Sequence, residues 1–264
     1  MSDASTCLDC ELKDGIAQVW LARPEQRNAL DETLMSELTA LFRRLDEEVS
    51  VRVIVLGGRG KAFCAGADLN WMARAARYDR AQNIEDVSRL SQLLQTIDGV
   101  SKPTIARIHG ACFAGATGLV AVCDLAVAAE DARFCFSEVR LGLVPATISP
   151  YVQRAMGYRA ALQHMLTAEV FDADTARRAG LISEIVTADH LDTRITELST
   201  TLCGSGPRAL AETKRLLRAI AGRPIDNSVV QRTIECIAEA RVSSEGVEGI
   251  RALLASEKPR WSRE

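Results

Sequence analysis

The sequence predicts an α/β protein in which helices cover parallel strands. Three observations support this class. Short apolar runs rich in valine, isoleucine and leucine alternate with segments whose apolar residues recur at helical spacing. With 264 residues, 47% of them hydrophobic and 25% charged, the chain can bury one large core and carry a further segment. After residue 207 the strand signal disappears, so the carboxyl end is expected to be helical.

The first elements are expected to be a hairpin and a helix. Residues 8–13 and 16–22 are β-like runs, and the Asp14-Gly15 pair between them is typical of a tight turn. Leucines at helical spacing then predict a helix over residues 31–49, with Asp31 as its N-cap.

Strands and helices alternate through the middle of the chain. An apolar strand over residues 51–56 ends at Gly57-Gly58. Further strands are expected over residues 104–108 and 125–129, and further helices over residues 84–97, 116–122, 151–167 and 173–179.

The carboxyl end begins at a change of character near Pro207. Helices are expected over residues 209–219 and 228–255. We therefore predict a core domain of residues 1–204, which carries the site, and an appended helical region of residues 205–264.

Bulk properties exclude several classes of function. The net charge of −3 and the pI of about 5.8 provide no general positive field for nucleic acid or an anionic membrane. No apolar run approaches the roughly 18 residues of a membrane span, and no targeting segment is evident, so a cytoplasmic location is expected. Cys7 and Cys10 form an isolated pair without a second pair at zinc spacing, so no metal site is expected.

Two glycine-containing turns can combine into one site. Residues 61–69 (KAFCAGADL) and residues 109–119 (HGACFAGATGL) each follow an apolar β-like run and each precede an expected helix. Unpaired N–H groups at such turns can hold an oxyanion between them, such as the thioester oxygen of an enolate. Either glycine turn alone is explained by a tight bend of the backbone. The pair favours an oxyanion site.

A carboxylate follows a third apolar run. Residues 134–138 (FCFSE) place Glu138 at the end of an expected strand. A partly apolar cleft would raise its pKa and allow it to accept and return a proton. An ordinary surface or ion-paired glutamate is the alternative.

Taken together, these segments resemble the crotonase superfamily, the enoyl-CoA hydratase/isomerase family. The resemblance extends through nearly the whole chain and rests on residues 23–30 (RPEQRNAL), residues 65–68 (AGAD), the turn around Gly115, Cys123-Asp124 and residues 137–142 (SEVRLG). It implies a spiral of ββα units in two roughly perpendicular sheets, followed by a helical trimerisation region whose trimers often pair into hexamers. An apolar stripe on the carboxyl-terminal helix is compatible with such packing.

The resemblance also implies roles for three residues. The N–H groups of Ala67 and Gly115 would hold the thioester oxygen, and Glu138 would be the catalytic acid/base. Loss of one such preorganised donor typically costs about 3 to 4 kcal/mol of transition-state stabilisation.

Gly118 is the position at which this chain departs from the two-carboxylate pattern. Many hydratases of the family have a second glutamate there, whereas this chain has no carboxylate between Gly115 and Asp124. Several isomerases of the family work with one glutamate, because moving a proton between two carbons needs one base and no water. An isomerase acting on a 3-enoyl-CoA is therefore the alternative to a hydratase.

The residue patterns of three segments favour hydration over isomerisation. Residues 63–72 (FCAGADLNWM), 137–143 (SEVRLGL) and 148–150 (ISP) are similar to a bacterial subgroup assigned as hydratases of branched glutaconyl-CoA thioesters. This subgroup includes the methylglutaconyl-CoA hydratases of leucine breakdown and the corresponding enzymes of acyclic terpene breakdown, and a glycine at the position of Gly118 is usual in it. We therefore expect an enoyl-CoA hydratase in which Glu138 alone activates water and protonates the α-carbon.

Coenzyme A binding is also implied by the resemblance. Arg27 and the backbone of Ala65, Asp68 and Leu69 would bind coenzyme A, and Lys258 would reach it from a neighbouring subunit. Asp68 is equally explained as a helix N-cap, and Lys258 as a solvated charge. Coenzyme A is part of the substrate, so no separate cofactor is expected.

Other residues are candidates for the acyl pocket and the attacking water. The pocket candidates are Trp71, Met72, Gly118 and Thr147, with core packing as the alternative for Trp71 and Met72. Further candidates for holding the water are Ser149 and His109, and Arg140 is a candidate partner for a distal carboxylate of the substrate.

A third interpretation is a catalytically silent CoA-thioester-binding or RNA-binding protein on the same scaffold. The acidic balance argues against RNA. Retention of both turns together with Glu138 argues against loss of catalysis.

Overall fold

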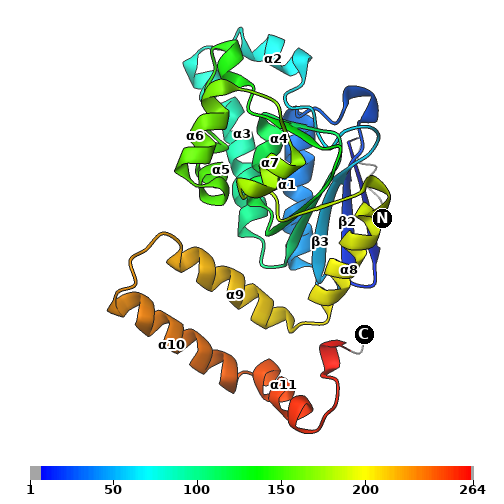
Figure 1. Ribbon diagram of the computed structural model, residues 1–264, viewed down its shortest axis with the longest axis vertical. Coiled ribbons are helices and arrows are strands. Elements are labelled where there is room, and N and C mark those ends of the chain that lie inside the picture. Colours follow the sequence, from blue (N-terminus) through cyan, green and yellow to red (C-terminus); the bar gives the residue numbers. More distant parts are fainter. Residues whose placement is uncertain (1–6, 263–264) are drawn as a thin grey trace.

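A six-stranded sheet in the order β1-β2-β3-β4-β6-β9 is the framework of the computed structural model, which describes residues 7–262 (Figure 1). β1 (Leu8–Lys13) and β2 (Ile16–Leu21) form the predicted antiparallel hairpin. All other neighbours in this sheet pair in parallel: β3 (Val53–Gly58), β4 (Thr104–Ile108), β6 (Leu125–Ala129) and β9 (Glu184–Val186). The α/β class predicted from the sequence is confirmed.

A second sheet has three short strands in the order β5-β7-β8. They are β5 (Ala111–Phe113), β7 (Arg133–Cys135) and β8 (Phe171–Asp172). β7 pairs in parallel with β5 and antiparallel with β8. β5 and β8 were not predicted, because two or three residues carry no periodicity.

Helices cover both faces of the large sheet. Alternate side chains of β3 point to opposite faces, so Ile54 and Leu56 lie in the main core and Val53 and Val55 in a smaller one. The smaller core is closed by α8 (Leu191–Cys203), which was not predicted. The main core is covered by α1 (Glu32–Glu47), α3 (Arg80–Gly99), α4 (Gly115–Val122) and α5 (Ser149–Met156).

Two predicted helices are each divided in the structure. The helix predicted over residues 151–167 is α5 and α6 (Tyr158–Thr167), because Gly157 between them has a left-handed φ of 75°. The helix predicted over residues 228–255 is α10 (Asn227–Val242) and α11 (Ser244–Leu254). Ser243 is extended there, and its side chain accepts a hydrogen bond from the N–H of Gly246 as the cap of α11.

The remaining elements are short. α2 (Leu69–Ala75) is the helix expected after the first glycine turn, and Asp68 is its N-cap. The others are α7 (Ala173–Arg178) and the 3-10 turns η1 (Pro24–Gln26), η2 (Glu138–Leu141), η3 (Ala188–His190) and η4 (Arg260–Ser262). Over residues 7–262, no helix combines the length and the apolar character that a membrane crossing requires.

The carboxyl-terminal helices lie at the opposite end of the molecule from α2 (Figure 1). α9 (Pro207–Ile220) is the one nearest the sheet, with α10 and α11 beyond it. Lys214 of α9 forms an ion pair with Asp124, with 2.5 Å between Nζ and Oδ2. The predicted boundary at residues 204–207 falls in the turn between α8 and α9.

Asn28 holds together the two segments that precede the first glycine turn. Its side chain is fully buried, and its Nδ2 group donates to the carbonyl oxygens of Arg59 and Ala62, both at 2.9 Å, and of Phe63 at 3.2 Å. Its Oδ1 atom accepts from the N–H of Arg23 at 2.9 Å. These bonds fix residues 59–63, from which the chain continues directly into the turn.

We expect Asn28→Ala to lower the free energy of unfolding by about 2 to 3 kcal/mol, because buried carbonyl groups lose their donor. Urea denaturation followed by circular dichroism measures this change. Asn227→Ala is the matched control, since Asn227 is exposed at the start of α10 and should change stability by less than about 0.5 kcal/mol. Equal losses in the two variants would contradict the role of Asn28.

Candidate active site

The two glycine turns lie side by side because the segments that lead into them pair in parallel. The N–H of Cys64 donates to Ala111 O at 3.0 Å, and the N–H of Phe113 donates to Cys64 O at 3.1 Å. Cys64 and Cys112 form a parallel bridge. A Cβ atom on Gly66 would lie 3.2 Å from Phe113 O, so the two backbones remain close where each one turns.

Ala67 has an N–H group that is not used by the fold. The neighbouring groups bond to Leu30, since Leu30 N donates to Gly66 O at 2.7 Å and Asp68 N donates to Leu30 O at 2.8 Å. Successive N–H groups of an extended segment point to opposite sides, so the N–H of Ala67 points away from Leu30. It has no hydrogen-bond acceptor within residues 7–262.

Gly115 is the first residue of α4, and its N–H likewise has no acceptor among the described residues. The orientation of this N–H is fixed through Ala114. The carbonyl of Ala114 accepts bonds from the backbone N–H and the hydroxyl of Thr117, at 2.9 and 2.6 Å. Because the peptide is planar and trans, holding the carbonyl of Ala114 also sets the direction of the Gly115 N–H.

Ala114 itself has an unusual backbone conformation, with φ of 49° and ψ of −125°. Such a conformation costs a residue with a Cβ about 1 to 3 kcal/mol and is concentrated at functional sites. Its N–H donates to Cys135 O at 2.8 Å, which attaches the turn to the end of β7. Thr117 was not among the predicted site residues. The only indication in the sequence was a hydroxyl residue in the first turn of an expected helix.

Glu138 follows β7 as the first residue of η2. Its Oε2 atom is buried and has no hydrogen-bond partner. Burial raises the pKa of Glu138, and a backbone hydrogen bond opposes this effect more weakly. The bond from Ala114 N to Cys135 O joins the end of β7 to the turn at Gly115. Glu138 follows that strand end by three residues, so its carboxyl lies on a segment attached to this turn.

Gly118 is buried on α4, and the place of a side chain there is already filled. A Cβ atom on Gly118 would lie 2.4 Å from Ile148 Cγ2 and 3.3 Å from Leu94 Cδ2. A glutamate at this position would overlap Ile148. The chain therefore has an apolar group where a second carboxylate would stand, and no sequence signal identified Ile148 as the cause.

The predicted coenzyme A residues lie around the first turn, with one exception. Arg27 is exposed, and its carbonyl accepts from the N–H of Ala65 at 3.0 Å. Asp68 is the N-cap of α2 and accepts from Asn70 N and Trp71 N at 2.9 and 3.0 Å.

Leu69 and Lys258 complete the set of predicted coenzyme A residues. Leu69 is 79% exposed at the start of α2. Lys258 is exposed in the segment after α11, and this segment lies far from α2 within one chain (Figure 1).

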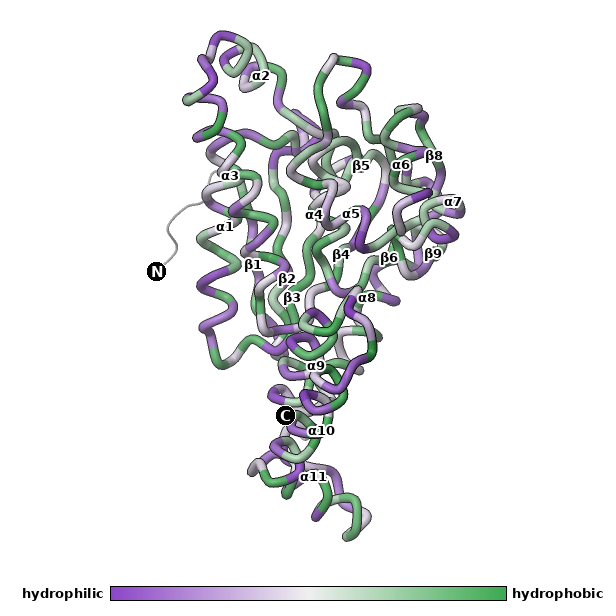
Figure 2. The backbone as a smooth tube through the Cα atoms, turned by 90° about the vertical axis from the view of Figure 1, so that its left-hand side faces the viewer, coloured by the Kyte–Doolittle hydropathy of each residue, from purple (hydrophilic) through white to green (hydrophobic). Residues whose placement is uncertain are grey.

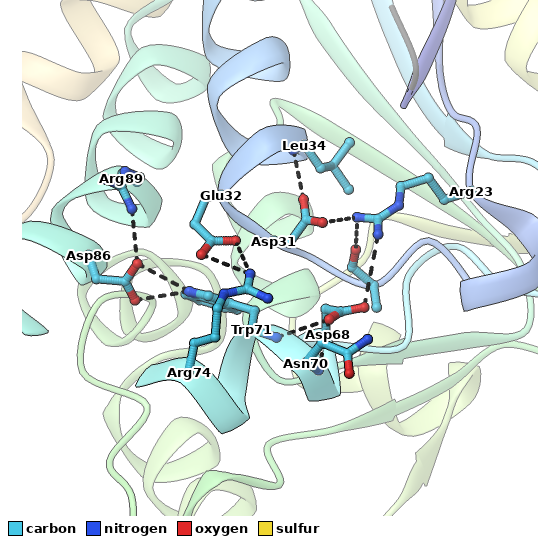
Figure 3. Close-up of polar contacts among 11 residues, drawn as sticks. Arg23, Asp31, Glu32, Leu34, Asp68, Asn70, Trp71, Arg74, Asp86 and Arg89 are labelled. Carbon is cyan, nitrogen blue, oxygen red and sulfur yellow. Dashed lines mark hydrogen bonds and ion pairs between the residues drawn. The ribbon is translucent and has the colours of Figure 1, made fainter. Parts of the chain in front are cut away.

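The first of the predicted pocket residues, Trp71, is held by a buried acid. Trp71 is partly buried against the main core, and its Nε1 donates to both carboxylate oxygens of Asp86 (Figure 3). Met72 is half-buried beside it, and Thr147 is half-buried next to Ile148. Asp86 was not among the predicted site residues, although the sequence places this acid on the same helix face as several leucines.

Three weaker candidates have other surroundings. Ser149 donates its hydroxyl to Ala146 O at 2.9 Å. The ring nitrogens of His109 lie 3.1 Å from Arg107 Nη1 and 2.8 Å from Gly60 O. Arg140 is exposed within η2.

A network of charged residues anchors the rim of the site (Figure 3). Arg23 forms an ion pair with Asp31 at 2.6 Å and a longer one with Asp68 at 3.9 Å. Arg74 of α2 pairs with Glu32 of α1 at 2.7 Å. The start of α2 is thereby tied to the start of α1.

Comparison with known proteins identifies relatives over nearly the whole chain. A family model described as enoyl-CoA hydratase/isomerase matches residues 11–264. A putative enoyl-CoA hydratase of Thermus thermophilus is 34% identical over 251 residues, which cover 94% of this chain and 98% of that protein. A peroxisomal Δ(3,5)-Δ(2,4)-dienoyl-CoA isomerase of Arabidopsis thaliana is 30% identical over 257 residues, covering 91% of this chain and 90% of that one.

A solved structure agrees with the fold throughout. The crystal structure of an enoyl-CoA hydratase from Shewanella pealeana superimposes with a TM-score of 0.95 at 42% identity, and the match covers 98% of this chain and 97% of that chain. The spiral α/β fold predicted from the resemblance is confirmed.

We expect Gly118→Ala to destabilise the protein by about 1 to 3 kcal/mol, because the added methyl group overlaps Ile148. The cost should be smaller when measured in an Ile148→Ala background, which removes the overlapping atoms. Urea denaturation of the four proteins in this cycle measures both values. Gly99→Ala is the control, since nothing lies within 4 Å of the added Cβ atom; an equal loss there would refute the crowding at Gly118.

We expect Glu138→Gln to stabilise the protein at pH 7. A raised pKa means that the folded protein disfavours the ionised carboxyl, so this penalty is present above the folded pKa. It vanishes as the pH falls below the unfolded value of about 4.3, where both states are protonated. Urea midpoints between pH 4 and pH 7 test this, with the exposed Glu130→Gln as control. A gain independent of pH would contradict the burial of the charge.

Proposed function

Because the chain belongs to the enoyl-CoA hydratase/isomerase family, we propose that it adds water across the α,β double bond of a 2-enoyl-CoA thioester. The observation that carries the proposal is the Glu138 carboxyl, whose buried Oε2 atom has no hydrogen-bond partner, beside the turn at Gly115, whose N–H has no acceptor within residues 7–262. A glutamate that served only to stabilise the fold would have a partner for both oxygens.

The proposed oxyanion site consists of the N–H groups of Ala67 and Gly115. In the reaction, negative charge develops on the thioester oxygen as the enolate forms. Donors that are already oriented stabilise this charge without reorganisation. The bonds from Leu30 and Thr117 supply that orientation, since they hold the carbonyls of Gly66 and Ala114, which belong to the same peptide groups as the two donors.

Glu138 moves the protons in the proposed mechanism. Its ionised carboxyl accepts a proton from water, and the water oxygen bonds to the β-carbon as the double bond becomes an enolate. The protonated Glu138 then delivers a proton to the α-carbon, and the thioester carbonyl is restored. The raised pKa of Glu138 suits both steps, because the carboxyl must gain a proton and lose it again in each turnover.

The acyl group is proposed to be branched or of the glutaconyl type. This follows from the similarity of residues 63–72 and 137–143 to hydratases of such thioesters. The filling of the Gly118 position by Ile148 supports it, since that subgroup also has glycine there. The exposed Arg140, within the same turn as Glu138, is the candidate partner for a distal carboxylate.

Isomerisation of a 3-enoyl-CoA is the second candidate function. Two observations favour it: a dienoyl-CoA isomerase is among the relatives, and Ile148 leaves the site with one acid. One base can remove a proton from one carbon and return it to another without water. The two reactions differ in whether solvent oxygen enters the product.

Coenzyme A is proposed to lie along the first turn. Arg27 would meet its phosphates. The N–H groups of Ala65 and Asp68 are already bonded within the fold, so Ala65 would offer its carbonyl oxygen. The carbonyl of Asp68 accepts from Met72 N at 2.9 Å and would offer its second lone pair, and Leu69, exposed at the start of α2, would offer its N–H.

We infer a homotrimer or homohexamer in the cytoplasm, in which Lys258 reaches the coenzyme A of a neighbouring subunit. Apolar and polar residues alternate along α10 and α11 (Figure 2). Several of the apolar ones are exposed in the single chain, namely Val230, Ile234, Ile237, Val247, Ile250 and Leu253. Packing between subunits would cover them.

We expect turnover of a 2-enoyl-CoA in ¹⁸O-water to give a 3-hydroxyacyl-CoA that carries the label. Mass spectrometry of the product, across straight-chain and glutaconyl-type substrates, measures this. A 3-enoyl-CoA converted without label would favour isomerisation instead.

Glu138→Gln should lower kcat/KM by about a hundredfold to ten-thousandfold. The control Glu130→Gln should retain full activity, and full activity of Glu138→Gln would refute both reactions as written.

A further inference from the structure

We propose that Asp86 is a positioning residue that holds the Trp71 indole against α3 and thereby fixes the wall along which the acyl chain binds. This inference rests on the proposed function, because it takes an acyl-CoA thioester as the ligand. It assigns a role to Asp86 and makes Trp71 a determinant of acyl-chain affinity.

Asp86 is a buried carboxylate with unusual partners. It is only 3% exposed on α3. Trp71 Nε1 lies 3.1 Å from Oδ1 and 3.0 Å from Oδ2, and Arg89 Nη1 lies 3.0 Å from Oδ1 (Figure 3). A buried ionised carboxylate is costly, and packed apolar residues usually serve stability as well or better. Stability alone therefore gives little reason for an acid at this position.

The bond to Asp86 is important for α2 because this helix has little other attachment. No residue of α2 is buried. Its amino end is capped by Asp68, and its carboxyl half is tied to α1 by the exposed pair of Arg74 and Glu32. The contact between Trp71 and Asp86 is a side-chain link from α2 to α3.

The position of Asp86 connects Trp71 to the second glycine turn. Leu90 follows Asp86 by one helical turn on α3, and a Cβ atom on Gly115 would lie 3.6 Å from Leu90 Cδ2. Trp71 and Leu90 both pack, partly buried, against the main core. Trp71 also lies four residues after Ala67. On this proposal, the indole and Leu90 form one apolar surface beside the two proposed oxyanion donors.

An acyl chain whose thioester oxygen is held by Ala67 and Gly115 would extend along this surface. A ring fixed by its N–H offers a preformed contact, whereas a free ring must be ordered when the chain binds. Loss of the bond should therefore weaken binding of the acyl chain and leave binding of the coenzyme A part unchanged.

The test measures affinity by calorimetry for free coenzyme A, butanoyl-CoA and decanoyl-CoA, none of which requires turnover. Trp71→Phe keeps a ring but removes the N–H, and Asp86→Leu removes the acceptor. Both should bind decanoyl-CoA about tenfold more weakly, as expected for loss of one hydrogen bond to a charged group. Affinity for free coenzyme A should not change.

Two further variants separate positioning from general damage. Asp86→Asn retains a side-chain oxygen that accepts from the indole, so it should remain within about threefold of the unaltered protein. Arg74→Ala removes the other side-chain attachment of α2 and should behave like the unaltered protein toward all three ligands. If Asp86→Leu does not fold, as judged by circular dichroism, Trp71→Phe alone decides the question.

The inference is overturned if Trp71→Phe loses affinity for free coenzyme A and decanoyl-CoA equally, or loses none. It is also overturned if the unaltered protein binds decanoyl-CoA no more tightly than coenzyme A. A protein that shows the expected pattern of affinities but converts no enoyl-CoA would refute the proposed reaction and support the role of Asp86.

Discussion

The parallel pairing of residues 63–64 with residues 109–113 is the constraint on which the site depends. Its bonds run from backbone to backbone, so they fix where both chains turn without using a side chain. Glycine is required where the chains approach most closely. A Cβ atom on Gly110, whose φ is 56°, would lie 2.2 Å from Lys61 O, and Gly66 has a φ of 102°. The two glycines therefore permit the close approach that leaves one unused amide on each chain.

Charge is distributed so that the carboxyl of Glu138 has no compensating partner. Two arginines near the first turn are already paired, Arg23 with Asp31 and Arg74 with Glu32. Within residues 7–262 no ion pair reaches Glu138, and burial is the main cause of its raised pKa. Ion pairs at the edge of the site thus hold α1 and α2 in place, whereas Glu138 retains a carboxyl whose protonation can change. That separation combines a scaffold fixed by ion pairs with an acid whose pKa is raised in the same fold.

The sequence predicted those features that depend on local chemistry. The hairpin at Asp14-Gly15, the cap at Asp31 and the alternation of strand and helix follow from residues next to one another. The two turns and Glu138 could be singled out as candidates because each of them follows an apolar β-like run closely in the sequence. Divided helices were missed because Gly157 and Ser243 interrupt patterns whose apolar spacing continues across the break.

Features that depend on packing between distant segments could not be predicted. Nothing near Gly118 in sequence shows that Ile148 occupies the space above it, and nothing near Trp71 shows that Asp86 accepts its N–H. Such contacts arise only when α2 packs on α3, and α4 on α5. They concern the finer properties of the site: how many acids it contains and how its apolar wall is held. Short motifs were sufficient to predict the family. The finer properties of the site depend on contacts between segments that are distant in the sequence.

α4 links the site to the carboxyl-terminal helices. Its first residue, Gly115, supplies one of the two unused amides, and its last turn leads into Asp124. Asp124 accepts bonds from the N–H and hydroxyl of Thr104 at 2.8 and 2.9 Å and pairs with Lys214 of α9. Both ends of a short helix are thus attached, one by the bond from the N–H of Ala114 to Cys135 O and the other by the ion pair between Asp124 and Lys214. The appended helices are therefore connected through α4 to the turn at Gly115, even though they lie at the far end of the molecule.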